Sequence, residues 1–93
     1  MVTDESILSK IADVIQDYNR VTGKAIRCTR LSMSDHFCDD LGGQSMDLIE
    51  MILALEDAFG VPISEEDFAD ADPWKLGKLV KYIASKVAEA DLA

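Results

Sequence analysis

Apolar residues recur every three or four positions in three long segments of the chain, which is the spacing of a helix with one buried side. The first segment covers about 4–19, the second about 45–59 and the third about 73–90. Gly23 lies just beyond the first segment, and Gly60 interrupts the second, in positions where glycine commonly ends a helix. The pattern therefore predicts three main helices over these ranges.

A fourth, short helix is predicted over about 65–71. Ser64 and Asp67 fit the acidic form of a capping box at its start. No segment shows convincing strand alternation, and the only candidate, 25–33, is short. We therefore predict an all-α fold, a small four-helix bundle of three main helices and one short helix with a long first loop, in a single domain over 1–93.

The connection between the first two helices, about 20–44, is long for a compact domain. Loops of this length are usually functional or partly ordered. A short helical turn somewhere in 25–35 is one way to order it. Another is contact with the core through four apolar side chains, Leu31, Met33, Phe37 and Leu41.

The helix predicted over 45–59 has apolar residues on two opposite sides. The core side holds Leu48, Met51, Ile52, Leu55 and Phe59. The other side mixes apolar with acidic residues, namely Met46, Asp47, Ile49, Glu50, Leu53, Glu56 and Asp57. Apolar anchors ringed by carboxylates are typical of a docking surface for a protein partner. A few exposed apolar residues are also ordinary on any protein, which is the interpretation without function.

The formal net charge of −9 is concentrated in the middle of the chain. Residues 31–72 hold twelve acidic residues and no lysine or arginine, whereas both ends are slightly basic. An acidic centre repels phosphate, so nucleic-acid binding is excluded. It attracts basic protein surfaces, or it serves only to keep the protein soluble.

The first ten residues carry acids where a secretory signal would be basic, and no run approaches the roughly 18 apolar residues of a membrane span. We therefore expect a cytoplasmic protein in which Cys28 and Cys38 are free thiols. These cysteines and His36 fit no common zinc spacing and lack a fourth ligand, so no metal site is predicted.

Ser45, at the start of the second helix, lacks the partners of a catalytic serine. The surrounding sequence GQSMD has no second glycine of a hydrolase elbow, and the single histidine, His36, lies in the long loop. Two interpretations remain: Ser45 caps the helix, or a group is attached to it. A phosphate ester there would be favoured by the helix N-terminus, and Gly42 and Gly43 leave the approach open.

The sequence "DDLGGQSMDLIEMILALEDAFGVPI" (39–63) resembles the acyl carrier proteins. The hallmark of that family is Asp-Leu-Gly-x-Asp-Ser-Leu, followed by an acidic and apolar helix, Glu-x-x-Phe and a turn containing proline. The match runs without gaps from Phe37 to Ile63 and continues more loosely through "LVKYI" (79–83).

The resemblance implies that a 4′-phosphopantetheine group is transferred from coenzyme A to Ser45, where its thiol carries acyl intermediates as thioesters. The chain would then be a monomeric carrier and not an enzyme, in fatty-acid, specialised lipid or polyketide biosynthesis. Its implied partners are a phosphopantetheinyl transferase and acyl-transferring and chain-elongating enzymes, whose basic patches would meet the acidic and apolar face described above. The resemblance also implies that the bundle interior shelters the acyl chain, among Ile52, Leu55, Phe59, Ile63 and Leu79.

Two departures from the family pattern suggest a specialised carrier. Gln44 replaces the aspartate before the serine, and Met46 replaces the following leucine. Loss of that aspartate's charge favours a dedicated transferase. The loop before Phe37 is also longer than usual and carries Arg27 and Arg30. The alternatives are a peptidyl or aminoacyl carrier, which uses the same serine, and an unmodified helical module for protein interaction.

Overall fold

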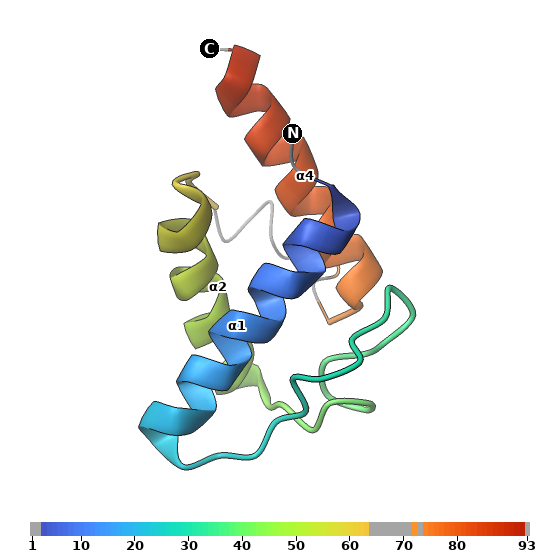
Figure 1. The fold of residues 1–93 in the computed structure, drawn as a ribbon, viewed down its shortest axis with the longest axis vertical. Coiled ribbons are helices and arrows are strands. Elements are labelled where there is room, and N and C mark those ends of the chain that lie inside the picture. Colours follow the sequence, from blue (N-terminus) through green and yellow to red (C-terminus); the bar gives the residue numbers. More distant parts are fainter. Residues whose placement is uncertain (1–2, 64–71, 73, 93) are drawn as a thin grey trace.

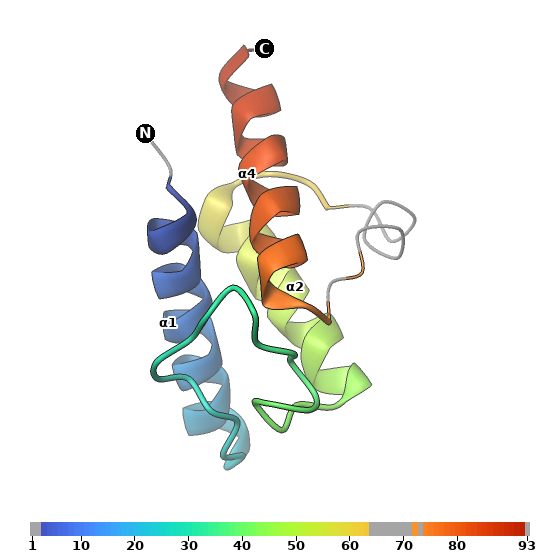
Figure 2. The same ribbon diagram turned by 90° about the vertical axis from the view of Figure 1, so that its right-hand side faces the viewer.

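Three helices make up the fold in the computed structural model, which describes residues 3–63, 72 and 74–92 (Figure 1). They are α1 (Asp4–Thr22), α2 (Ser45–Phe59) and α4 (Leu76–Leu92). α1 packs against both α2 and α4, and the last turns of α4 extend past the other helices (Figures 1 and 2). The short helix predicted over 65–71, with its capping box, lies outside the described residues. The all-helical prediction is confirmed for the described part of the chain.

The ends of α1 follow from its flanking residues. The Thr3 hydroxyl accepts a hydrogen bond from the Ser6 N–H at 3.1 Å, which caps the start. The helix ends three residues later than predicted, because the left-handed residue that stops it is Gly23, at φ 77°. The Gly23 N–H donates to the Asn19 carbonyl at 2.8 Å, so the chain stays helical up to that glycine.

α2 has the predicted bounds, whereas α4 begins at Leu76 instead of about residue 73. The helix starts later than predicted because the backbone of the long loop pairs with the residues just before α4. The Phe37 N–H donates to the Trp74 carbonyl at 2.6 Å, and His36 and Lys75 form an isolated antiparallel bridge. The Trp74 carbonyl thus accepts from the loop, while the Lys78 N–H donates to the Lys75 carbonyl at 3.0 Å, so the helical hydrogen bonds start after Trp74.

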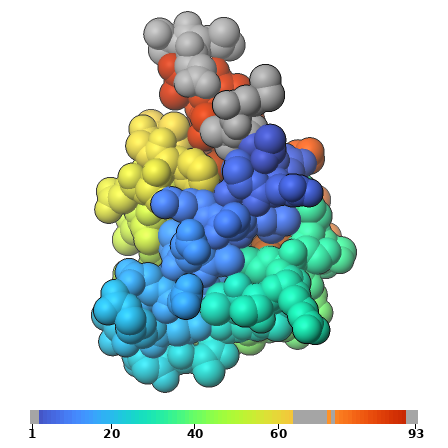
Figure 3. Space-filling view, viewed as in Figure 1, coloured from blue at the N-terminus to red at the C-terminus, as the bar shows by residue number. Residues whose placement is uncertain are grey.

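One hydrophobic core joins the helices and the loop. Phe37 and Leu41 are buried in it, and Leu31 and Met33 pack against it, so the predicted contact of these four loop side chains with the core is confirmed. The core also contains Ile7, Ile11, Ile15, Ile26, Leu48, Met51, Ile52, Leu55, Ile63, Leu76, Leu79, Val80 and Ile83. On the face seen in Figure 3, the atoms of α1 and of the long loop adjoin one another, and the end of α2 lies beside them.

The long loop is ordered by hydrogen bonds and contains no helix or strand over 25–35, but one turn is closed there by the Asp35 N–H, which donates to the Ser32 carbonyl at 3.0 Å. Arg27 organises much of it: its N–H donates to the Leu41 carbonyl at 3.0 Å, and its guanidinium lies 3.0 Å from the Asp35 carboxylate. The same guanidinium donates to the carbonyls of Thr29 and Arg30. Among the described residues, no helix combines the length and apolar character needed to cross a membrane.

Candidate functional site

Ser45 is the first residue of α2 and is exposed. The N-cap position belongs to Gln44, whose backbone is extended at φ −111° and ψ 174°. The interpretation of Ser45 as the helix cap is therefore wrong. No described residue makes a hydrogen bond with the Ser45 hydroxyl, which leaves its oxygen open to an approaching group. The backbone N–H groups of the first helical turn have no carbonyl four residues earlier to pair with, and they favour an anion beside this oxygen.

The turn before Ser45 is closed by hydrogen bonds from two glycines. The Gly42 N–H donates to the Cys38 carbonyl at 3.0 Å, and the Gly43 N–H donates to the Phe37 carbonyl at 2.9 Å. Gly42 has φ 86° and open space around it, as expected for an accessible approach. Gly43 is buried instead, because the Phe37 ring occupies the space where its side chain would lie.

His36 is hydrogen-bonded within the same turn. Its Nδ1 accepts hydrogen bonds from the N–H groups of Cys38 and Asp39, each at 3.1 Å. Its ring stacks on Trp74 with 5.9 Å between ring centres. Within the described ranges, no three histidine, cysteine or acidic side chains come together as a metal site.

The outward face of α2 is exposed much as the sequence predicts. Met46, Ile49 and Leu53 keep 66%, 50% and 53% of their surface exposed. Glu50 and Asp57 are exposed beside them. Glu56 is less exposed than these two acids and is half-buried, because its Oε1 accepts a hydrogen bond from the Ile63 N–H at 2.8 Å.

Asp47 does not belong to this face, and its predicted outward position is wrong. Its side chain is only 2% exposed. Its Oδ1 accepts from the Tyr18 hydroxyl and from Lys24 Nζ, each at 2.5 Å, and its Oδ2 accepts the Gln44 N–H at 2.9 Å. The carboxylate faces inward because three donors meet it there.

The protonation of Asp47 reflects two opposing effects. Burial alone raises the pKa of this carboxyl, but hydrogen bonds from Lys24, Tyr18 and the Gln44 N–H lower it further, so that its pKa lies below the ordinary value. Its hydrogen bond raises the pKa of the Lys24 ammonium and of the Tyr18 hydroxyl. All three groups therefore keep their usual protonation state at neutral pH.

Sequence reasoning missed Tyr18 and Lys24 as partners of Asp47. Both lie more than twenty positions earlier in the chain, beyond the reach of helical periodicity. One signal was present, since an acidic residue three positions after an N-cap residue commonly accepts its backbone N–H. The signal was hidden because glutamine is not a usual N-cap residue.

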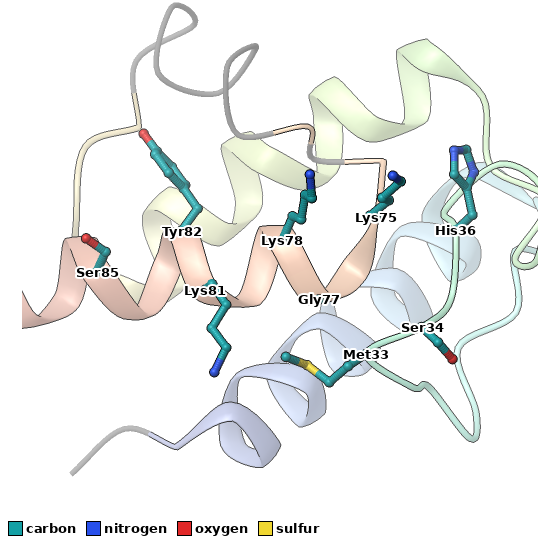
Figure 4. Close-up of a pocket in the computed structure, with 9 residues that line it drawn as sticks. All are labelled: Met33, Ser34, His36, Lys75, Gly77, Lys78, Lys81, Tyr82 and Ser85. Carbon is teal, nitrogen blue, oxygen red and sulfur yellow. The ribbon is translucent and has the colours of Figure 1, made fainter.

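The five residues expected to shelter an acyl chain lie in or against the core. Four are buried, and Phe59 packs against the core from a half-buried position; the buried four are Ile52, Leu55, Ile63 and Leu79. A groove of about 790 Å³ lies instead along α4, lined by Lys78 and Tyr82 of the helix and by Lys75 just before it (Figure 4). None of the five residues lines it.

Comparison with known proteins places this geometry in context. Residues 9–83 match the family model described as "Phosphopantetheine attachment site". The acyl carrier protein of Clostridium acetobutylicum is 31% identical over 83 residues, covering 89% of this chain and 99% of that protein. The acyl carrier protein of Solidesulfovibrio magneticus is 32% identical over 84 residues, with coverage of 90% and 99%. The solved acyl carrier protein of Enterococcus faecalis is 32% identical, with a TM-score of 0.63 over 91% of this chain and 99% of that one.

Proposed function

This chain belongs to the acyl carrier proteins, a family of carriers with a phosphopantetheine attachment domain, and from that premise we propose that Ser45 is its attachment residue. The observation that carries the proposal is an exposed serine at the first position of α2, with no hydrogen-bond partner among the described residues. The chain itself then needs no catalytic base, because the transferase supplies one.

In the proposed reaction, Ser45 Oγ forms a bond to the phosphorus that bears pantetheine in coenzyme A. The P–O bond of the pyrophosphate linkage breaks, and 3′,5′-ADP leaves with the electron pair. The serine proton passes to a base of the transferase. The product is a phosphodiester with one negative charge at the start of α2, where the helix dipole and free N–H groups favour it. Its terminal thiol supplies the thioester linkage to the acyl group.

We propose the outward face of α2 as the surface that meets partner enzymes. Met46, Ile49 and Leu53 are exposed apolar anchors in a row along the helix, and Glu50 and Asp57 are exposed acids beside them. Buried apolar contacts supply most of the affinity in such interfaces, and charges supply orientation and association rate. The complementary partner surface is basic with apolar pockets.

We further propose that the acyl chain enters the core between α2 and α4. Ile52 and Leu55 of α2 and Leu79 of α4 have apolar side chains and lie in the same buried cluster. Phe59 is half-buried at the edge of this cluster, in a position to admit a chain. The pathway is fatty-acid, specialised lipid or polyketide biosynthesis.

Intact-mass spectrometry after co-expression with a broad-specificity phosphopantetheinyl transferase tests the attachment site. We expect wild-type chain to gain the mass of one phosphopantetheinyl group and Ser45→Ala to gain none. A matched control, Ser85→Ala, removes an exposed serine from α4 and should be modified like the wild type. Modification of Ser45→Ala would place the group elsewhere. Failure to modify wild-type chain with any transferase would favour an unmodified interaction module, and loading with amino acids in place of acyl groups would favour a peptidyl carrier.

A further inference from the structure

A buried carboxylate lies two residues after the proposed attachment serine. Asp47 has 2% of its side chain exposed, whereas Ser45 and Met46 beside it are exposed. A charged carboxylate is costly to bury unless each oxygen is hydrogen-bonded. Here both oxygens are used, so the arrangement is fully satisfied and directional.

The donors to Asp47 come from separate parts of the chain. The Tyr18 hydroxyl lies near the end of α1, and Lys24 lies just beyond it. The third donor is the backbone N–H of Gln44, the residue directly before the serine. The carboxylate thus connects the end of α1 to the backbone that enters α2.

The start of α2 needs such an anchor. The first turn of any helix lacks half of the helical hydrogen bonds and frays most easily. Two hydrogen bonds hold the Gln44 backbone between the glycine turn and Ser45: its carbonyl accepts the Leu48 N–H at 3.0 Å, and its N–H donates to the Asp47 carboxylate at 2.9 Å. Loss of the bond to Asp47 would leave the backbone that enters α2 held at the carbonyl alone.

We propose that Asp47 is a positioning residue for modification of Ser45, holding the serine backbone through Gln44 while Tyr18 and Lys24 fix the carboxylate. The inference rests on the proposed function of Ser45. It assigns to Tyr18 and Lys24 a role in a reaction that they do not touch. It also separates two tasks of α2, since the exposed residues Ile49 and Glu50 meet the partner and the buried Asp47 orients the serine.

The experiment measures steady-state transfer from coenzyme A to the chain, with kcat and KM for the chain determined separately. The variants are Tyr18→Phe, Lys24→Met and Asp47→Asn, each of which removes one member of the cluster. Because the docking residues are left intact, KM should stay near the wild-type value. Because the serine is less well placed, kcat should fall, on the order of 10-fold for Asp47→Asn and less for each single donor. Lys24→Arg keeps a positively charged donor and should recover part of the loss.

Controls separate positioning from loss of stability. Ile83→Val trims a fully buried residue of α4 and destabilises the fold without touching the cluster, so its kcat should match the wild type at a temperature where both are folded. Asp13→Asn makes the same chemical change on an exposed carboxylate of α1. Amide hydrogen exchange should be faster at residues 44 and 45 in the cluster variants only.

The outcomes are distinct. The positioning role would be overturned if the wild type is modified and Tyr18→Phe and Lys24→Met both keep the wild-type kcat and the wild-type rate of amide exchange. Equal kcat losses in Ile83→Val would assign the effect to stability and would also overturn it. An unmodified wild type would overturn the proposed function and this inference together. If Asp47→Asn does not fold, the two single-donor variants decide the question.

Discussion

The packing of Gly43 against Phe37 predicts a large effect for a single added methyl group. A β-carbon added at Gly43 would lie 2.1, 2.4 and 2.7 Å from three atoms of the Phe37 ring. Ordinary van der Waals contact begins near 3.4 Å, so the ring or the turn would have to move by more than about 1 Å. Gly43 has no positive φ, so the effect of Gly43→Ala is steric and not a matter of backbone conformation.

The magnitude follows from where the ring lies. Phe37 is 1% exposed and its ring also packs against the Trp74 ring, with 6.2 Å between ring centres, so the ring has little room to move. Overpacking of this kind costs about 1–3 kcal/mol, and we expect the upper part of that range. For a domain of this size, each kcal/mol lowers Tm by about 4–8 °C. The expected loss in Tm for Gly43→Ala, at about 2–3 kcal/mol, is therefore about 8–24 °C.

Thermal and urea denaturation followed by circular dichroism measure this loss. The double variant Gly43→Ala/Phe37→Leu tests the cause, because a smaller residue at 37 relieves the clash. The free energy of unfolding lost in the double variant should be at least about 1 kcal/mol less than the sum of the losses in the two single variants. Gly42→Ala is the matched control: it is disfavoured by its φ of 86°, contacts nothing, and should add independently to Phe37→Leu. A Gly43→Ala variant within about 0.5 kcal/mol of wild type, or strict additivity with Phe37→Leu, would refute the steric argument.

Three further predictions concern the charged groups around α2. Glu50→Lys should slow acyl transfer by a partner enzyme, more at low salt than at high salt since salt screens exposed charges, and a rate that is unaffected at low salt would move the docking face elsewhere. The pKa of the Asp47 carboxyl is lower in the folded chain than its ordinary value, so the charged carboxylate stabilises the fold. This stabilisation is complete at a pH above the pKa of Asp47 in the unfolded chain, and it is lost as pH falls through the pKa of Asp47 in the folded chain. Urea denaturation should thus show wild type more stable than Asp47→Asn by about 2 kcal/mol at pH 7, with the difference shrinking below about pH 4, and a difference independent of pH would contradict the charged, hydrogen-bonded state. Gln44→Asp should raise the rate of Ser45 modification by a broad-specificity transferase, measured by intact mass over time, and an equal rate would count against a dedicated partner for this chain.

Helical periodicity predicted the main elements because each helix buries one apolar side. The bounds of α2 follow from the sequence alone, since Ser45 starts the periodic run and Gly60 supplies the left-handed end. The start of α4 could not be predicted in the same way. It depends on backbone pairing of Trp74 and Lys75 with the long loop, and such pairing leaves no periodic trace.

In the candidate site, too, some side-chain positions could be predicted from the sequence and others could not. The exposure of Met46, Ile49 and Leu53 follows from their angle around the helix. The burial of Asp47 does not, because a carboxylate on a helix is assumed to face water unless donors are known to meet it. Those donors are brought together only when α1 packs on α2, so their identity is a property of the tertiary fold.

The turn before Ser45, the proposed attachment residue, depends on residues 74–77, which are synthesised well after it. Phe37 pairs with the Trp74 carbonyl, the Leu76 N–H donates to the Asp35 carbonyl at 2.9 Å, and the Gly77 N–H donates to the Met33 carbonyl at 2.9 Å. During translation, the segment before Ser45 therefore waits for 74–77 to leave the ribosome before it can acquire its final hydrogen bonds. We expect nascent chains stalled before residue 74 to resist modification even when Ser45 is accessible to the transferase. Efficient labelling of such stalled chains would show that the turn forms without α4, whereas absence of labelling would show that modification of Ser45 requires residues 74–77.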